Sequence, residues 1–222
     1  MKKGLVVVGI LSFLLAGCST TGSSAKETDP EVQEISVSLP AELTTLDTTQ
    51  TTDKVTFTVI QHLFEGSYRF DEKSQPVPGL AEEAVISEDG KTYTFKLKEE
   101  AKWSDGQQVQ AADFAYAWKK LVDPKTMGPN AYLLDNVVNS QDIREGKADI
   151  ATIGLETPDE KTFVVHLEQL QPSFLSVVSI GWLAPKRQSY VEEKGTAYGK
   201  TSEDLLYTGP FILKDWQQTG AE

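Results

Sequence analysis

The sequence has little of several residue types on which catalytic and metal sites depend. Its 222 residues include one cysteine, Cys18, and two histidines, His62 and His166. A single cysteine forms no intramolecular disulfide, and the two histidines make no His-x-x-x-His pair. A phosphate loop and a Gly-x-Ser-x-Gly elbow are also missing. We therefore expect no enzyme, no metal and no cofactor, with both histidines in structural roles.

Positive charge is scarce as well. The chain has 21 lysines and arginines against 33 aspartates and glutamates, a formal net charge of −12. Nucleic-acid binders need basic patches that displace counterions from phosphate, so we expect no nucleic-acid partner. Anionic lipid headgroups would repel this chain too, so membrane affinity would have to come from acyl chains.

The chain also lacks a hydrophobic run of about 20 residues, the length that spans a membrane. The apolar run at residues 5–16 is shorter, follows two lysines and ends in Leu-Ala-Gly-Cys at residues 15–18. This pattern is typical of a secretory signal, and the final four residues resemble the lipobox of bacterial lipoproteins. We predict a signal peptide over 1–17 and a lipid anchor at Cys18 on the outer face of the bacterial cytoplasmic membrane. The alternative is an ordinary signal peptide with an incidental cysteine.

Residues 18–33 are rich in Ser, Thr, Gly, Lys and Glu, and we predict a flexible linker there. Beyond it, apolar and polar residues alternate over 34–39, which predicts a half-buried strand. Residues 51–64 fit both a strand and a helix. Asp53 is placed to cap a helix, so we favour the helix.

Mixed strands and helices follow without regular βαβ alternation, which indicates a mixed α/β (α+β) fold. The clearest helix covers 111–122, where apolar side chains recur every three to four residues and Asp123-Pro124 ends the pattern. Strands are predicted at 67–70, 84–86, 92–98, 162–167 and 211–213, helices at 136–145 and 172–178, and turns at 71–74, 76–79, 87–90 and 105–106.

Several segments together resemble the oligopeptide-binding lipoproteins of ABC importers, within the extracellular solute-binding proteins of family 5. They are residues 46–47 (LD), 63–66 (LFEG), 76–82 (PVPGLAE), 92–97 (TYTFKL), 101–106 (AKWSDG), 112–118 (ADFAYAW), 122–124 (VDP), 208–211 (TGPF) and 213–216 (LKDW). Large residues such as Trp103, Phe114 and Trp118 would be buried scaffold. The motifs therefore identify the family without marking its site.

The resemblance implies a type II periplasmic-binding-protein-like fold, with peptide held between two lobes. Residues 34–64 and 185–222 would belong to the first lobe and 65–184 to an inserted domain, the block most able to fold alone. The opposing lobe would be absent, since family members are more than twice as long, and the fold is accordingly predicted as truncated.

The resemblance places a ligand-contacting segment at Thr52, Asp53 and Lys54, where this sequence departs from the expected carboxylate and small apolar residue. An exposed loop or helix cap is an equally good interpretation of these three residues. A peptide-facing tyrosine of the family maps near Asn130 or Tyr132.

The function implied is a lipid-anchored, monomeric component of an ABC importer that binds oligopeptides and delivers them to permease and ATPase subunits. The alternative is a surface lipoprotein that acts as an interaction or adhesion module without peptide binding. Two carboxylates that meet across a cleft are the one enzymatic arrangement the sequence leaves open.

Overall fold

The computed structural model describes residues 34–216, so the predicted signal peptide, Cys18 anchor and linker lie outside the described residues. Residues 39–216 belong to one compact unit, and residues 34–38 lie outside it. Residues 34–38 form no strand, and Ile35 and Val37 are 67% and 73% exposed. The predicted strand at 34–39 is therefore wrong: the alternation is present, but the segment joins neither sheet, so its backbone lacks the pairing that defines a strand.

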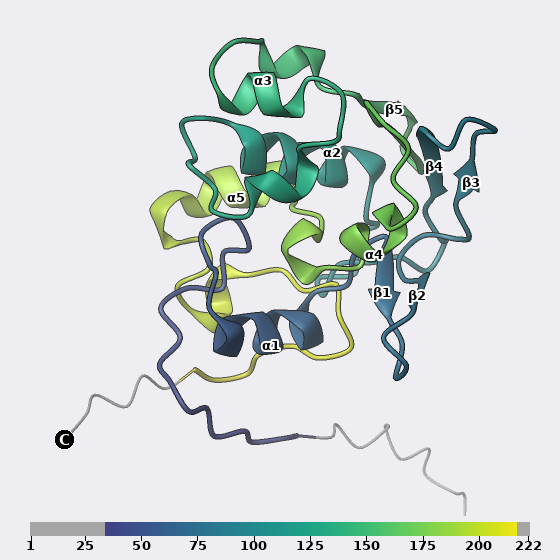
Figure 1. The fold of residues 1–222 in the computed structure, drawn as a ribbon. Coiled ribbons are helices and arrows are strands. Elements are labelled where there is room, and N and C mark those ends of the chain that lie inside the picture. The colour runs from purple at the N-terminus through teal and green to yellow at the C-terminus, as the bar shows by residue number, and fades with distance from the viewer. Residues whose placement is uncertain (1–33, 217–222) are drawn as a thin grey trace, which may run out of the picture. The chain divides into compact units, whose positions relative to one another are not determined.

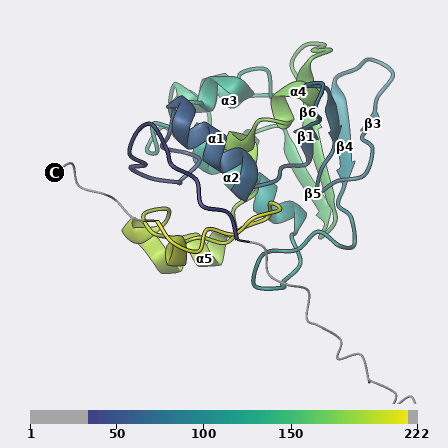
Figure 2. The same ribbon diagram turned by 90° about the horizontal axis from the view of Figure 1, so that it is seen from below.

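A four-stranded antiparallel sheet of order β3-β4-β6-β5 organises the larger part of the unit (Figures 1 and 2). Its strands are β3 (Val85–Ile86), β4 (Thr92–Lys96), β5 (Leu155–Asp159) and β6 (Thr162–His166). The central pair aligns Tyr93 with Val165 and Phe95 with Phe163. Three of these strands were predicted. β5 was not, because it is an edge strand with four exposed residues and no buried alternation.

A separate two-stranded ribbon pairs β1 (Tyr68–Phe70) with β2 (Pro76–Pro78). The sequence predicted β1 but read residues 76–79 as a turn. Proline is tolerated in a strand at a sheet edge, where its missing N–H costs no ladder hydrogen bond. Both strands of a two-stranded ribbon are edges, so the two prolines of β2 fit here.

Helix α2 (Ala111–Val122) covers the four-stranded sheet and has the predicted bounds. Asp113 caps its first turn, since its Oδ2 accepts hydrogen bonds from the Gln110 backbone N–H at 2.9 Å and from Trp103 Nε1 at 3.1 Å. Burial raises the pKa of Asp113 despite these bonds.

The two predicted helices at 136–145 and 172–178 are shorter than expected. They are α3 (Ser140–Arg144) and α4 (Phe174–Val178). Asn139 has a left-handed backbone with φ of 61°, so α3 begins only after it. Helix α1 (Lys54–Leu63) formed as predicted, whereas α5 (Gln188–Lys194) was not predicted.

The buried apolar residues form two clusters. The larger one, here the sheet core, contains residues between Tyr68 and Leu183 together with Leu206. Phe163 lies at its centre, with ring centroids 5.1 Å from Trp118, 5.7 Å from Phe114 and 6.3 Å from Phe95. Trp118 also donates a hydrogen bond from Nε1 to the Leu183 carbonyl at 3.0 Å. A cluster of aromatic rings in edge-on and stacked pairs, with the Trp118 N–H hydrogen-bonded, therefore fills the centre of this core.

The smaller cluster, here the terminal core, is built from residues 43–64 and 184–207, with Leu213 and Trp216 partly buried against it. It contains no strand in the part of the chain the structure describes. The predicted strand at 211–213 is wrong, because Phe211 and Ile212 are 41% and 67% exposed and no strand pairs with them.

A buried ion pair lies within the terminal part of the molecule. Lys186 is 2% exposed, and its Nζ is 2.5 Å from Asp47 Oδ1 and 4.7 Å from the centre of the Tyr198 ring. Its backbone N–H donates to the Asp113 carbonyl of α2 at 3.1 Å. The pair therefore sits where residues around 47 and 186 meet the helix that covers the sheet.

None of the helices within residues 34–216 is both long and apolar enough to cross a bilayer.

Candidate functional site

Three predicted ligand contacts lie at the surface where α1 begins. Thr52, Asp53 and Lys54 are exposed, whereas Thr51 directly before them is 4% exposed. Asp53 is the N-cap of α1, as predicted, and its Oδ1 accepts a hydrogen bond from the Thr56 backbone N–H at 2.8 Å. The cap fixes the downstream end of this exposed segment.

The Asp53 carboxylate is held in its charged form. Burial alone would raise its pKa, but hydrogen bonds to the carboxylate, that of the Thr56 backbone N–H among them, outweigh burial and lower the pKa below its ordinary value. A hydrogen bond that the charged form accepts favours that form. The segment therefore offers an anionic group at residue 53 and the cationic side chain of Lys54 beside it, both within reach of solvent.

Asn130 lies against this segment from the other part of the chain. Its side chain is 2% exposed, and its Nδ2 donates a hydrogen bond to the Thr51 carbonyl at 2.7 Å, across 79 positions of sequence. Figure 1 shows the loop that follows α2 beside the loop that precedes α1. The structure thus brings all four predicted site residues together, with three exposed and Asn130 buried.

Tyr132, the other position considered for a peptide-facing residue, is 54% exposed. It lies in the short helical turn Ala131–Leu134, whose Ala131 and Leu134 side chains are buried in the sheet core. The two buried side chains therefore anchor the loop that carries Asn130 to the sheet core.

The histidines take part in local structure. His62 Nδ1 is 2.7 Å from the Thr58 carbonyl one turn back in α1. His166 bridges neighbouring strands, with Nε2 2.9 Å from Glu156 Oε1 and Nδ1 3.2 Å from Thr92 Oγ1. Within residues 34–216, no group of three or more His, Cys, Asp or Glu side chains is arranged to hold a metal ion.

A cavity of about 560 Å³ lies at the other end of α1, where the sequence predicted no site. It is lined by Gln61, His62, Phe64, Glu65, Gly66, Tyr68, Arg69, Phe70, Ser179, Gly181, Thr208, Gly209 and Pro210. Two of the family-like segments, LFEG at 63–66 and TGPF at 208–211, run side by side here, with the Gly209 N–H donating to the Leu63 carbonyl at 2.9 Å. Those two motifs were the signal that could have located it.

Glu65 is the ionisable group most affected by this cavity. Burial raises its pKa, and Arg69 and Lys98 oppose that shift only in part. Its backbone is clamped by Thr208, whose Oγ1 accepts from the Glu65 N–H at 3.0 Å and donates to the Glu65 carbonyl at 3.1 Å. The cavity wall therefore includes a backbone segment held by two hydrogen bonds and, beside it, a carboxyl group with a raised pKa.

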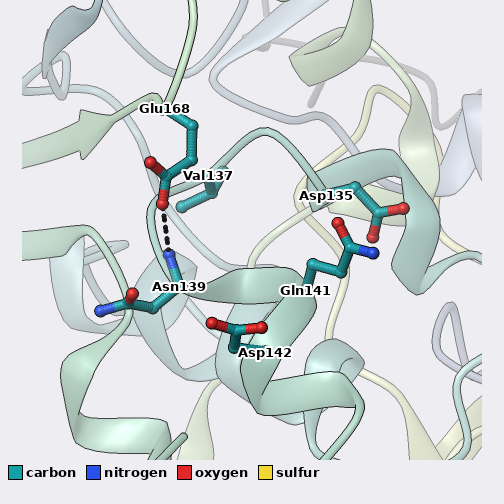
Figure 3. A pocket seen from close by; sticks show the side chains of 6 residues that line it. All are labelled: Asp135, Val137, Asn139, Gln141, Asp142 and Glu168. Carbon is teal, nitrogen blue, oxygen red and sulfur yellow. Dashed lines mark hydrogen bonds between the residues drawn. The ribbon is translucent and has the colours of Figure 1, made fainter. Parts of the chain in front are cut away.

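A smaller hollow of about 160 Å³ lies between α3 and the end of β6 (Figure 3). Figure 3 shows Glu168 and Asp135 on opposite sides of it, with Gln141 turned toward Asp135. Glu168 accepts a hydrogen bond from the Asn139 N–H at 3.1 Å, and Asp135 is paired with Arg144 at 2.8 Å. Two of its three carboxylates, Glu168 and Asp135, thus hold local structure together, and the predicted ligand contacts lie elsewhere.

Comparison with known proteins places the whole described unit in one family. The family described as "Bacterial extracellular solute-binding proteins, family 5 Middle" matches residues 75–221. Among curated relatives, the chain is 36% identical over 208 residues to the dipeptide-binding protein of Lactococcus lactis, covering 94% of this chain and 36% of that protein. It is 33% identical over 219 residues to the periplasmic oligopeptide-binding protein OppA of Salmonella typhimurium, covering 97% of this chain and 40% of that protein.

Solved structures give the same picture. Listeria monocytogenes OppA bound to peptide superposes with a TM-score of 0.78 at 36% identity, over 81% of this chain and 36% of that one. The substrate-binding domain of an oligopeptide ABC transporter from Bacillus anthracis superposes with a TM-score of 0.77 at 40% identity, over 79% of this chain and 34% of that one. The chain thus spans a third to two fifths of the length of these relatives. The fold is the predicted periplasmic-binding-protein-like type II fold, present as a fragment.

Proposed function

The chain belongs to the bacterial extracellular solute-binding proteins of family 5, and we propose that it acts as the oligopeptide-binding component of an ABC importer. The observation that carries this proposal is the match to relatives named as peptide-binding proteins, one of them solved with peptide bound. The protein would bind peptide without chemistry of its own, and importer permease and ATPase subunits would be its partners.

The exposed segment Thr52, Asp53 and Lys54 supports the proposal as the ligand contact of the first lobe, with Asn130 behind it. Peptides carry N–H and C=O groups along their backbone and opposite charges at their ends. Neighbouring anionic and cationic side chains on a fixed turn suit such ligands.

We further propose the predicted domain boundaries, with 34–64 and 185–222 in a first lobe and 65–184 inserted between them. The division of buried residues into sheet core and terminal core supports this. Limited proteolysis followed by mass spectrometry tests it: a resistant product close to 65–184 is expected. Loss of that product before residues 185–222 are removed would contradict the boundaries.

Lipid anchoring through Cys18 is part of the proposal. Metabolic labelling with an alkyne palmitate analogue should label the protein and retain it in the membrane fraction. Cys18→Ser should abolish the label and release the protein. Equal labelling of wild type and Cys18→Ser would refute the anchor without affecting the proposed peptide binding.

Isothermal titration of the purified gene product with a mixed library of short peptides tests the central proposal. Saturable binding is expected, and weaker binding by Lys54→Ala and Asp53→Ala would place the contact. Glu88→Ala, an exposed change at the distant turn between β3 and β4, is the control. Absence of binding by folded protein would overturn the proposal and favour an interaction or adhesion module.

A further inference from the structure

We infer that Asn130 is a positioning residue, which orients the ligand-contacting segment by holding the Thr51 carbonyl rather than by touching ligand. The inference rests on the proposed function, because it concerns how that binding surface is presented. It begins from the burial of Asn130: with 2% of its surface exposed, the side chain has almost nothing to offer a ligand directly.

The Asn130 side chain instead restrains the backbone through a hydrogen bond. Its Nδ2 lies 2.7 Å from the Thr51 carbonyl, a short and buried contact. Thr51 is itself buried, and its Oγ1 has no hydrogen-bond partner in the described structure. The amide of Asn130 is therefore the main polar restraint on the peptide unit that joins Thr51 to Thr52.

Both sides of this hydrogen bond are anchored. On one side Asn130 precedes a helical turn whose Ala131 and Leu134 are buried in the sheet core. On the other side the segment continues into α1 through the Asp53 cap. Residues 52–54 are therefore held at each end, upstream by Asn130 and downstream by the cap.

A second, weaker link joins the same two stretches of chain. Gln50 Nε2 lies 3.5 Å from the Thr126 carbonyl, at the limit of hydrogen bonding. The two links tie residues 50–51 to residues 126–130 and so join the exposed segment to the loop after α2. A surface that is ordered before ligand arrives loses less entropy on binding, which strengthens affinity without a new contact.

Hydrogen–deuterium exchange tests the inference without requiring any ligand. In Asn130→Ala, the amides of Thr56 and Phe57 should exchange about tenfold faster while α2 is unchanged, because they donate to Asp53 and its position would lose the restraint from Asn130. Asn136→Ala is the control, because it removes another asparagine amide that donates to the Gln169 carbonyl at 2.8 Å, a contact outside this segment. Unchanged exchange at Thr56 and Phe57 would overturn the inference.

Peptide affinity then separates positioning from direct contact. We expect Asn130→Ala to weaken binding about tenfold, Asn130→Ser, which keeps a short donor, to weaken it less, and Asn136→Ala to leave it within twofold. Asn130→Ser also serves as the test variant if Asn130→Ala does not fold, as judged by circular dichroism.

A double-mutant cycle completes the test. If Asn130 acts through the segment, its replacement should cost little extra affinity once Asp53→Ala has removed both the cap and the anionic contact. Additive losses, or a changed peptide preference in Asn130→Ala, would mean direct contact and overturn the inference. Failure of wild-type protein to bind any peptide would refute the proposed function alone, since the exchange result stands independently.

Discussion

The sheet core and the terminal core are built from the same kinds of residues but differ in how their backbone is organised. In the sheet core, strands pair on both sides of β4 and β6, and α2 covers the sheet. The terminal core is made of helices and loops within the described residues. Exposed large apolar residues occur beside both cores, Val85 and Ile86 in β3 and Phe211 and Ile212 near the terminal core. The difference between the cores therefore lies in strand pairing and not in how completely apolar side chains are covered.

Two tryptophans make the contrast measurable. Trp118 is 1% exposed in the sheet core and has a hydrogen-bond partner, whereas Trp182 is partly buried against the terminal core and its Nε1 has none in the described structure. We expect Trp118→Ala to lower the free energy of unfolding by about 4 kcal/mol and Trp182→Ala by about 2 kcal/mol. Urea denaturation at neutral pH measures both. Equal losses would remove the distinction between the cores, and Trp118→Phe serves if the alanine variant is unfolded.

The ion pair of Asp47 and Lys186 should be the strongest polar determinant of the terminal part. Removing one partner leaves the other charge buried, which costs about 3 kcal/mol, whereas replacing both by apolar residues is far less costly. We therefore expect Asp47→Leu and Lys186→Met each to destabilise strongly and the double variant to recover most of the loss. Losses under 1 kcal/mol for both single variants would mean that solvent reaches the pair.

Acid should affect the two regions in opposite directions. Burial would raise the pKa of Asp47, but Lys186 and hydrogen bonds from Thr49 outweigh it and lower the pKa below its ordinary 3.8. The stabilisation from Asp47 is therefore complete above pH 3.8 and is lost as the pH falls through the lower folded value. Asp113 has a raised pKa, so folded protein gains stability as the pH falls from that raised value toward 3.8.

Urea denaturation between pH 7 and pH 3 checks these signs. The stability advantage of wild type over Asp47→Asn should stay constant to about pH 4 and then shrink. Relative to Asp113→Asn, wild type should instead improve on acidification before reaching a plateau near pH 3.8. If the stability difference from wild type changed with pH in the same direction for both variants, the pKa direction given for Asp47 or for Asp113 would be wrong.

The smallest effect is expected at the exposed edge of the terminal part. Ile212 is 67% exposed and unpaired by any strand of the described residues, so Ile212→Ser should change the free energy of unfolding by less than about 0.5 kcal/mol. Leu213→Ser, at the partly buried neighbour, should cost more and is the control. A large loss from Ile212→Ser would show that this segment is buried in solution.

Elements with signals at both ends were predictable from the sequence, and elements defined by distant neighbours were not. Helix α2 has the expected bounds because Asp113 caps its start and Asp123-Pro124 ends its pattern. Residues 34–39 carry a clear strand alternation, yet a strand depends on a partner that the local sequence does not specify. Strand β5 shows the converse: it is paired, but its exposed residues carry no alternation.

The candidate site also has features that the local sequence predicts and features that depend on distant segments. The Asp53 cap follows from local chemistry and was predicted. Asn130 was proposed only from family resemblance, and its contact with Thr51 spans 79 positions, so no local pattern could reveal it. The cavity between residues 61–70 and 208–210 also depends on two distant segments, and was missed.

The order of strands in the four-stranded sheet has a consequence for how the chain folds. Hairpin partners β3 with β4 and β5 with β6 are close in sequence, but the central β4–β6 pairing joins Thr92 to His166 across 74 positions. Closing so long a loop is entropically costly and slows folding relative to local hairpins. The two hairpins should therefore form first, and the pairing of β4 with β6, which aligns Phe95 with Phe163, should be the rate-limiting step.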